Sequence, residues 1–143
     1  MKLKLHRYSS VSKPVETPQV VLVDAMGVLR QCYQLASVAI VAGSFTSKVG
    51  GHNILEPLYY DVPVIFGPYM FGQPELLELV LDYDAGLQVK DCASVGEAAA
   101  LLLENMQARS KIIEAGTKLV AENRGATEHT YNEIEYYLTR KMK

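Results

Sequence analysis

The chain has 143 residues, of which 49% are hydrophobic and 21% are charged, proportions typical of one soluble globular domain. Fourteen lysine and arginine residues against sixteen acidic residues give a net charge of −2, which excludes a strong overall attraction to nucleic acid. No apolar run reaches the roughly 18 residues that a membrane-spanning helix needs. The two cysteines, Cys32 and Cys92, form neither a disulfide framework nor a metal-binding pattern, which favours a reducing compartment.

Short apolar runs alternate with helical patterns over roughly the first ninety residues. The runs that are apolar on both faces, as expected of parallel strands covered on both sides, are 19–24, 37–42 and 62–66. Weaker strand patterns occupy 3–8 and 85–89, and helical patterns occupy 28–35, 53–60 and 74–81. This alternation predicts right-handed βαβ units in a doubly wound parallel sheet, an α/β fold of the Rossmann-like type.

From residue 94 onward the sequence shows helical patterns alone. Ser94 and Glu97 are spaced as a capping box, and apolar residues continue at helical spacing through 109–123 and 127–140. The segment with two prolines, 13–18, is too short for a domain linker. We therefore predict a single domain, 1–143, with a helical C-terminal tail.

The stretch 43–57 follows a predicted buried strand and opens a predicted helix, the position at which open α/β sheets bind ligands. Gly50 and Gly51 would allow close approach of the backbone, and the amides that follow would favour phosphate or carboxylate. A second interpretation is purely structural, because Asn53 and Glu56 also fit a capping box and the glycines a plain turn. The three histidines are too scattered to predict a metal site.

Five segments occur in an order that resembles the C-terminal half of 3-deoxy-D-manno-octulosonic acid (Kdo) transferases. They are VDAMGVL at 23–29, AGS at 42–44, GGHNILEP at 50–57, PVIFGP at 63–68 and NRGA at 123–126. The most specific signal is GGHN-x-LEP followed by the strand that ends in Gly-Pro. The resemblance covers the chain from about residue 7 to residue 138.

The resemblance implies the C-terminal half of a glycosyltransferase-B fold. Such enzymes transfer Kdo from CMP-Kdo to a lipid A precursor in lipopolysaccharide biosynthesis, at the cytoplasmic face of the bacterial inner membrane. The resemblance further implies that the acceptor site, the catalytic carboxylate and the membrane association belong to an N-terminal half, which this chain lacks. We therefore expect no catalytic residue, metal or cofactor in this chain, with CMP-Kdo as its donor ligand, and we expect the chain alone to be soluble and inactive.

Residue by residue, the resemblance implies a donor site. Gly50, Gly51, His52 and Asn53 would surround the phosphate and the sugar-acid carboxylate, and Glu56 would accept hydrogen bonds from the ribose hydroxyls. Met26 and Gly27 would lie against the cytosine, and Ser44 would line the cleft. The sequence departs from the family pattern at Ala42, Tyr69 and 71–73, which concerns the edge of the donor cleft.

More than one interpretation stays open for the last helix and for the overall function. One face of this helix would either bury a partner surface or simply cover the sheet. The residues of that face are Tyr131, Ile134, Tyr136 and Tyr137. As a function, another nucleotide-sugar transferase or epimerase of the same fold is a second hypothesis. A non-catalytic α/β interaction module is the third, and the Gly-Gly-His-Asn loop counts against it.

Overall fold

The computed structural model describes residues 3–10, 14 and 16–141, and for 126–129, 140 and 141 it describes the backbone alone. The predicted connection 13–18 therefore lies partly outside the described residues. The chain divides into two compact units, Met1–Ala36 and Ser37–Lys143. Each unit is described by itself below.

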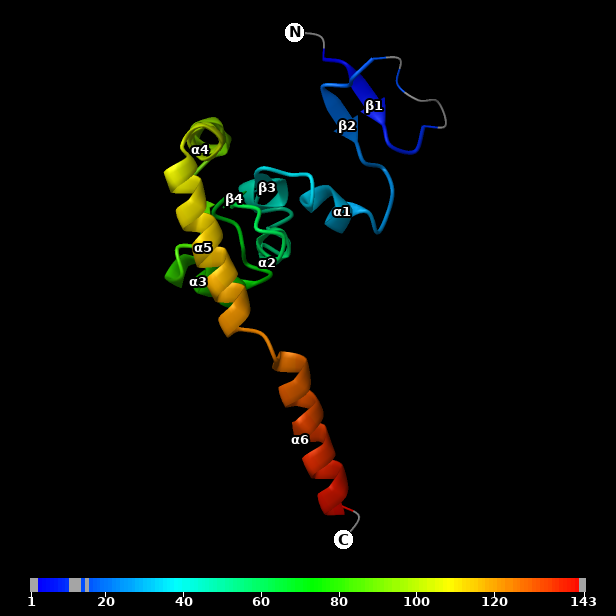
Figure 1. Ribbon diagram of the computed structural model, residues 1–143, viewed down its shortest axis with the longest axis vertical. Coiled ribbons are helices and arrows are strands. Elements are labelled where there is room, and N and C mark those ends of the chain that lie inside the picture. The colour runs from blue at the N-terminus through cyan, green and yellow to red at the C-terminus, as the bar shows by residue number, and fades with distance from the viewer. Residues whose placement is uncertain (1–2, 11–13, 15, 142–143) are drawn as a thin grey trace. The chain divides into compact units, whose positions relative to one another are not determined.

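The described residues of the Met1–Ala36 unit form two short parallel strands and one helix, which Figure 1 labels β1, β2 and α1. Strand β1 (Leu5–Arg7) pairs with β2 (Val20–Leu22), with Leu5 opposite Val20. Helix α1 (Leu29–Tyr33) follows β2. The predicted strands and helix are thus present but shorter than the patterns suggest. β2 pairs with β1 in a sheet separate from that of the later strands, so the described residues form two parallel sheets instead of one.

The Ser37–Lys143 unit is built on three parallel strands that lie in chain order. β3 (Ala39–Val41) pairs with β4 (Val64–Phe66), and β4 pairs with β5 (Gly86–Gln88). Helix α2 (Leu55–Leu58) connects β3 to β4, and α3 (Pro74–Asp82) connects β4 to β5. Pro74 stands at the start of α3, as predicted. Proline is tolerated there because the amides of the first helical turn have no acceptor within the helix, so no hydrogen bond is lost.

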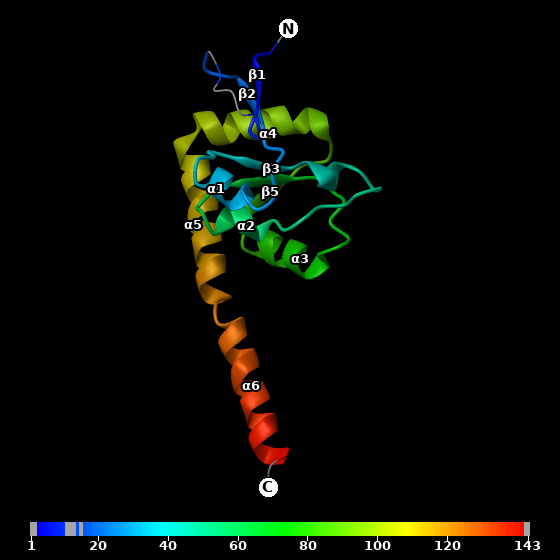
Figure 2. The ribbon, with the colours of Figure 1, turned by 90° about the vertical axis from the view of Figure 1, so that its right-hand side faces the viewer.

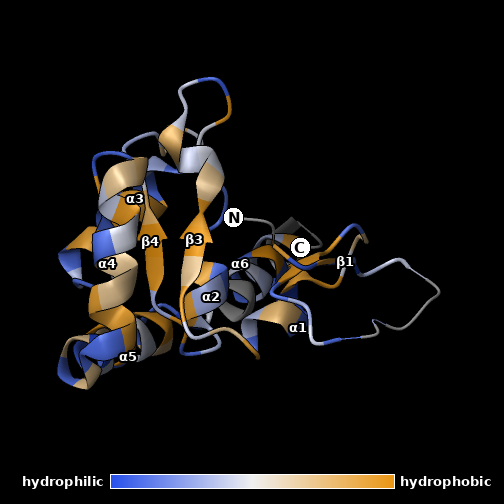
Figure 3. Ribbon diagram, turned by 90° about the horizontal axis from the view of Figure 1, so that it is seen from above, coloured by the Kyte–Doolittle hydropathy of each residue, from blue (hydrophilic) through white to orange (hydrophobic). Residues whose placement is uncertain are grey.

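The central strand β4 explains how the layers are held together. All three of its side chains are completely buried, and Figure 3 shows the strand as hydrophobic along its length. Ile65 packs in a cluster with Ala98 and Leu102 of α4 (Cys92–Glu104). Val64 and Phe66 point to the opposite face, toward Val80 of α3, because successive side chains of a strand alternate between faces. The sheet therefore lies between α4 and α3 (Figure 2).

Two helices begin earlier than predicted. The capping box at Ser94 is wrong, because the backbone amide of Ser94 donates to Asp91 Oδ1 at 2.9 Å, and α4 already begins at Cys92. In the same way Asn105 Oδ1 accepts from the Ala108 amide at 3.0 Å and starts α5 (Met106–Glu122). Asn105 also ends α4, so one residue joins the two helices. Both helices are capped at their N-terminus by an Asp or Asn side chain, about one turn before the predicted helical pattern begins.

The final helix α6 (Ala126–Lys141) matches the predicted tail. Its four predicted contact residues, Tyr131, Ile134, Tyr136 and Tyr137, expose between 50% and 63% of their surface. What this helix covers stays a prediction. Within the described ranges, no helix combines the length and the apolar character needed to cross a membrane.

Candidate functional site

Six of the eight predicted site residues, namely Ser44, Gly50, Gly51, His52, Asn53 and Glu56, lie in the connection between β3 and β4. A single 3-10 turn, η1 (Ala42–Phe45), follows β3 directly. The segment 67–73 leaves β4 and leads to α3. Because parallel strands end at the same edge, the β3–β4 connection and the 67–73 segment meet at the carboxyl edge of the sheet.

Backbone hydrogen bonds join three segments at this edge. The Gly51 amide donates to the Tyr69 carbonyl at 2.7 Å, and the Tyr69 amide donates to the Ser44 carbonyl at 2.9 Å. The Gly50 amide donates to the Thr46 carbonyl at 3.1 Å. Both glycine amides are therefore committed inside the protein. The next two amides along the chain, of His52 and Asn53, make no hydrogen bond within the part of the chain that the structure describes.

Both glycines lie against side chains of the segment that follows β4. A Cβ atom at Gly51 would lie 1.8 Å from the sulfur of Met70, so any side chain there collides with the segment that follows β4. Gly50 has a φ of +77°, and a Cβ there would lie 2.8 Å from the Phe71 ring. In the structure these two glycines lie close to the side chains of Met70 and Phe71, in the segment 67–73.

Asn53 and Glu56 do not form the predicted capping box. Asn53 Oδ1 accepts from the Leu55 amide, two residues on, at 2.9 Å. The N-cap of α2 is Ile54, which places Glu56 at the second helical position instead of the third. A side chain that satisfies an amide two residues ahead forms a local turn in place of a cap. Within the described part of the chain no partner engages the half-buried Glu56 carboxylate, so it is available to a ligand.

Ser44 and His52 lie in contrasting environments. The Ser44 side chain is completely buried, and its hydroxyl accepts a hydrogen bond from the Gly67 amide at 2.6 Å while donating to the Val41 carbonyl. His52 is exposed at the solvent side of the loop. A ligand at this edge would therefore meet His52 directly, whereas Ser44 lies beneath the loop.

The remaining predicted residues, Met26 and Gly27, follow β2 in the other unit. Met26 is 98% exposed, and Gly27 adopts a φ of +81° in the turn that leads to α1. Close by in sequence, the Asp24 carboxylate accepts hydrogen bonds from the Ser9 amide and hydroxyl at 2.9 and 2.7 Å. Arg7 Nε adds a third at 3.1 Å. The hydrogen bonds from Ser9, assisted by the charge of Arg7, lower the pKa of Asp24.

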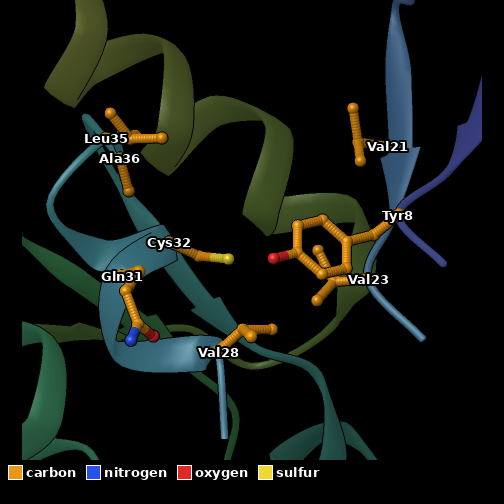
Figure 4. Close-up of a pocket in the computed structure, with 8 residues that line it drawn as sticks. All are labelled: Tyr8, Val21, Val23, Val28, Gln31, Cys32, Leu35 and Ala36. Carbon is orange, nitrogen blue, oxygen red and sulfur yellow. The ribbon is translucent and has the colours of Figure 1, made fainter. Parts of the chain in front are cut away.

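Sequence reasoning missed an apolar pocket in the Met1–Ala36 unit. Its volume is about 440 Å³, and Figure 4 shows the Tyr8 hydroxyl and the Cys32 sulfur pointing toward one another across it. The other lining residues are Val21, Val23, Val28, Gln31, Leu35 and Ala36. The signal was present in the sequence, because Val21 and Val23 share one face of an extended segment and 28, 32 and 35 share one side of a helix.

No metal centre is found among the described residues, since no three histidine, cysteine or acidic side chains come close enough to hold an ion. Considering only the described residues, the loop presents two amides without a hydrogen-bond partner, the His52 imidazole and the unpaired Glu56 carboxylate. This set suits a ligand that carries both an anionic group and hydroxyl groups.

Comparison with known proteins gives a consistent assignment, although no family model matches the chain. A 3-deoxy-D-manno-octulosonic acid transferase of Haemophilus influenzae is 36% identical over 142 residues, which is 99% of this chain and 33% of that protein. The Chlamydia pneumoniae protein of the same name is 35% identical over 119 residues, 83% of this chain and 27% of that protein. The chain thus spans about a third or less of the length of these curated relatives.

A solved structure extends the likeness to the fold. The crystal structure of the C-terminal CMP-Kdo binding domain of WaaA from Acinetobacter baumannii superimposes with a TM-score of 0.77 at 32% identity. The match covers 82% of this chain and 61% of that one. The parallel α/β fold with its loop at the carboxyl edge is that of one half of a glycosyltransferase-B enzyme. More particularly, the chain is a homologue of the Kdo transferases over nearly its whole length, as the sequence motifs predicted.

Proposed function

We propose that this chain is the donor-binding domain, 1–143, of a Kdo transferase, and that it binds CMP-Kdo for transfer of Kdo to a lipid A precursor. The observation that carries the proposal is the loop 50–56. There the amides of His52 and Asn53 and the carboxylate of Glu56 are free of partners in the described residues, in a chain similar to a CMP-Kdo binding domain.

In the proposed complex, the loop stabilises the charge of the leaving group. Negative charge develops on the CMP phosphate as the bond to Kdo breaks, and fixed amide donors stabilise such charge without having to reorganise. The amides of His52 and Asn53 supply these donors, and the His52 imidazole adds another. The dipole of α2 contributes little, because this helix has only four residues.

The other residues have complementary roles in the proposal. Glu56 accepts hydrogen bonds from the ribose hydroxyls, and Gly50 and Gly51 fix the loop. No metal or cofactor takes part. The base that deprotonates the acceptor hydroxyl is a carboxylate of an N-terminal half, which also contacts the acceptor and the cytoplasmic face of the inner membrane.

Binding of CMP and UDP to the chain tests the donor assignment. We expect CMP to shift the backbone amide NMR signals of His52, Asn53 and Glu56, and UDP to bind more weakly. Glu56→Gln should weaken CMP binding by about tenfold, since it replaces a charged acceptor by a neutral one. Glu104→Gln, at the exposed end of α4, is the matched control and should bind as the unchanged chain does.

Each other result contradicts the proposal in a distinct way. A preference for UDP would favour another nucleotide-sugar enzyme of the same fold. No response to either nucleotide would favour an interaction module. Efficient transfer from CMP-Kdo to a lipid A precursor by the pure chain would overturn the assignment of proton transfer to another part of the enzyme.

A further inference from the structure

Ser44 is the one buried polar side chain among the described residues, and it is completely buried. Such a group is costly unless both its donor and its acceptor are satisfied. The Ser44 hydroxyl satisfies both, because it donates to the Val41 carbonyl and accepts from the buried Gly67 amide at 2.6 Å. It therefore ties the end of β3 to the end of β4.

The backbone of Ser44 extends this link to the loop. Its carbonyl accepts from the Tyr69 amide at 2.9 Å, and the Tyr69 carbonyl accepts from the Gly51 amide at 2.7 Å. Ser44 also packs directly beneath Gly51, since a Cβ placed on Gly51 would lie 3.2 Å from the Ser44 Cβ. A continuous series of contacts therefore runs from the Ser44 hydroxyl to the residue before His52.

We propose that Ser44 is a positioning residue for the donor loop. It does not touch the ligand. It fixes the segment 67–69, which in turn fixes Gly51 and so sets where the amides of His52 and Asn53 point. This inference rests on the proposed function for its effect on ligand binding, whereas its effect on the loop itself can be measured without any ligand.

Ser44→Ala separates positioning from general stability. Removal of the hydroxyl leaves the Gly67 amide buried without an acceptor, so the link between the two strand ends is lost. We expect the Gly51 and Gly67 amides to exchange faster with solvent while amides in α4 and α5 keep their exchange rates. CMP affinity should fall on the order of ten- to a hundredfold, because a displaced amide loses its hydrogen bond to a charged group of the ligand.

Ile112→Val is the matched control. It removes a buried methylene from the cluster around Ile65 and destabilises the fold away from the loop. It should leave both the Gly51 exchange rate and the CMP affinity of the folded protein unchanged. Equal loss of affinity in the two variants would mean that Ser44 acts only through stability, which overturns the proposal.

A second variant and a measurement without ligand cover the cases in which the first experiment gives no answer. If Ser44→Ala does not fold, Ser44→Cys replaces it, because a thiol keeps a weaker donor and acceptor and should give an intermediate exchange rate at Gly51. If the unchanged chain does not bind CMP, the proposed function fails, and the exchange rate of Gly51 still decides whether Ser44 holds the loop. Unchanged exchange at Gly51 in the Ser44 variant that folds contradicts the inference.

Discussion

The backbone amide of Gly51 donates a 2.7 Å hydrogen bond to the carbonyl oxygen of Tyr69. The bond joins the loop after β3 to the segment after β4, so the conformation of the loop depends on residues more than fifteen positions away. It also removes one amide from any role in anion binding. The donors that remain belong to His52 and Asn53, which are one and two residues further along.

Gly51→Ala should disrupt this junction. The new Cβ would meet the Met70 sulfur at 1.8 Å, so Met70 or the loop must move, and overpacking of this kind costs about 1–3 kcal/mol. Gly96→Ala is the matched control, because Gly96 lies on the exposed side of α4 and its Cβ would meet nothing within 4 Å. It should stabilise the chain by about 0.5–1 kcal/mol. Urea unfolding of both variants measures the difference, and equal stabilities would contradict the packing described for Gly51.

Two substitutions of Asn53 distinguish its effect on stability from its effect on ligand binding. Asn53→Ala removes the acceptor of the Leu55 amide and should destabilise the chain by about 1 kcal/mol. Asn53→Asp keeps an acceptor, so it should fold as stably as the original chain, but it adds negative charge beside the proposed phosphate position. We expect its CMP affinity to fall by about tenfold or more, given the cost of placing like charges together. Normal CMP affinity in Asn53→Asp would argue against an anion at this place.

Asn105→Ala tests the joint between α4 and α5. The side chain accepts from the Ala108 amide at 3.0 Å and is the N-cap of α5, so its loss should cost about 0.5–2 kcal/mol. Asn105→Ser keeps a capping oxygen and should recover most of the loss. Thermal unfolding measures both. Equal destabilisation by alanine and serine would show that the cap contributes nothing.

The Asp24 carboxylate predicts a dependence on pH. Its pKa is lowered in the folded chain by the hydrogen bonds from Ser9 and then by Arg7, so the unfolded chain binds the proton more readily. The stabilisation is therefore present above the unfolded pKa of about 3.8 and is lost as the pH falls through the lower folded value. Ser9→Ala should move the Asp24 pKa upward toward 3.8 in an NMR titration of the side-chain carboxyl. An unchanged pKa in Ser9→Ala would refute the assigned cause.

Much of the fold was accessible from sequence because its signals are local. The buried run 62–66 predicted β4, and the alternation of strands with helices predicted that its neighbours pair with it in parallel. The helix starts at Cys92 and Met106 were missed, because Asp91 and Asn105 compete with nearby polar residues as caps and only the backbone conformation selects among them. Strand lengths were overestimated for a related reason, since pairing ends where the partner strand does.

The site was less predictable than the fold. The motif 50–57 correctly marked a loop at the carboxyl edge of the sheet. It could not show that the Gly51 amide is committed to Tyr69, or that Ser44 is buried and linked to Gly67, because these bonds join segments distant in sequence. The capping box at Asn53 and Glu56 failed because Asn53 satisfies the Leu55 amide instead.

The order β3-β4-β5 in the sheet is also the order in the chain. Each strand that leaves the ribosome can therefore pair with a strand already made, and no later segment has to insert between earlier ones. Assembly in this direction leaves the newest strand as an open edge until the next arrives. Among the described residues this sheet ends on β3 and β5, each only three residues long, and short strands offer little edge for pairing with another chain.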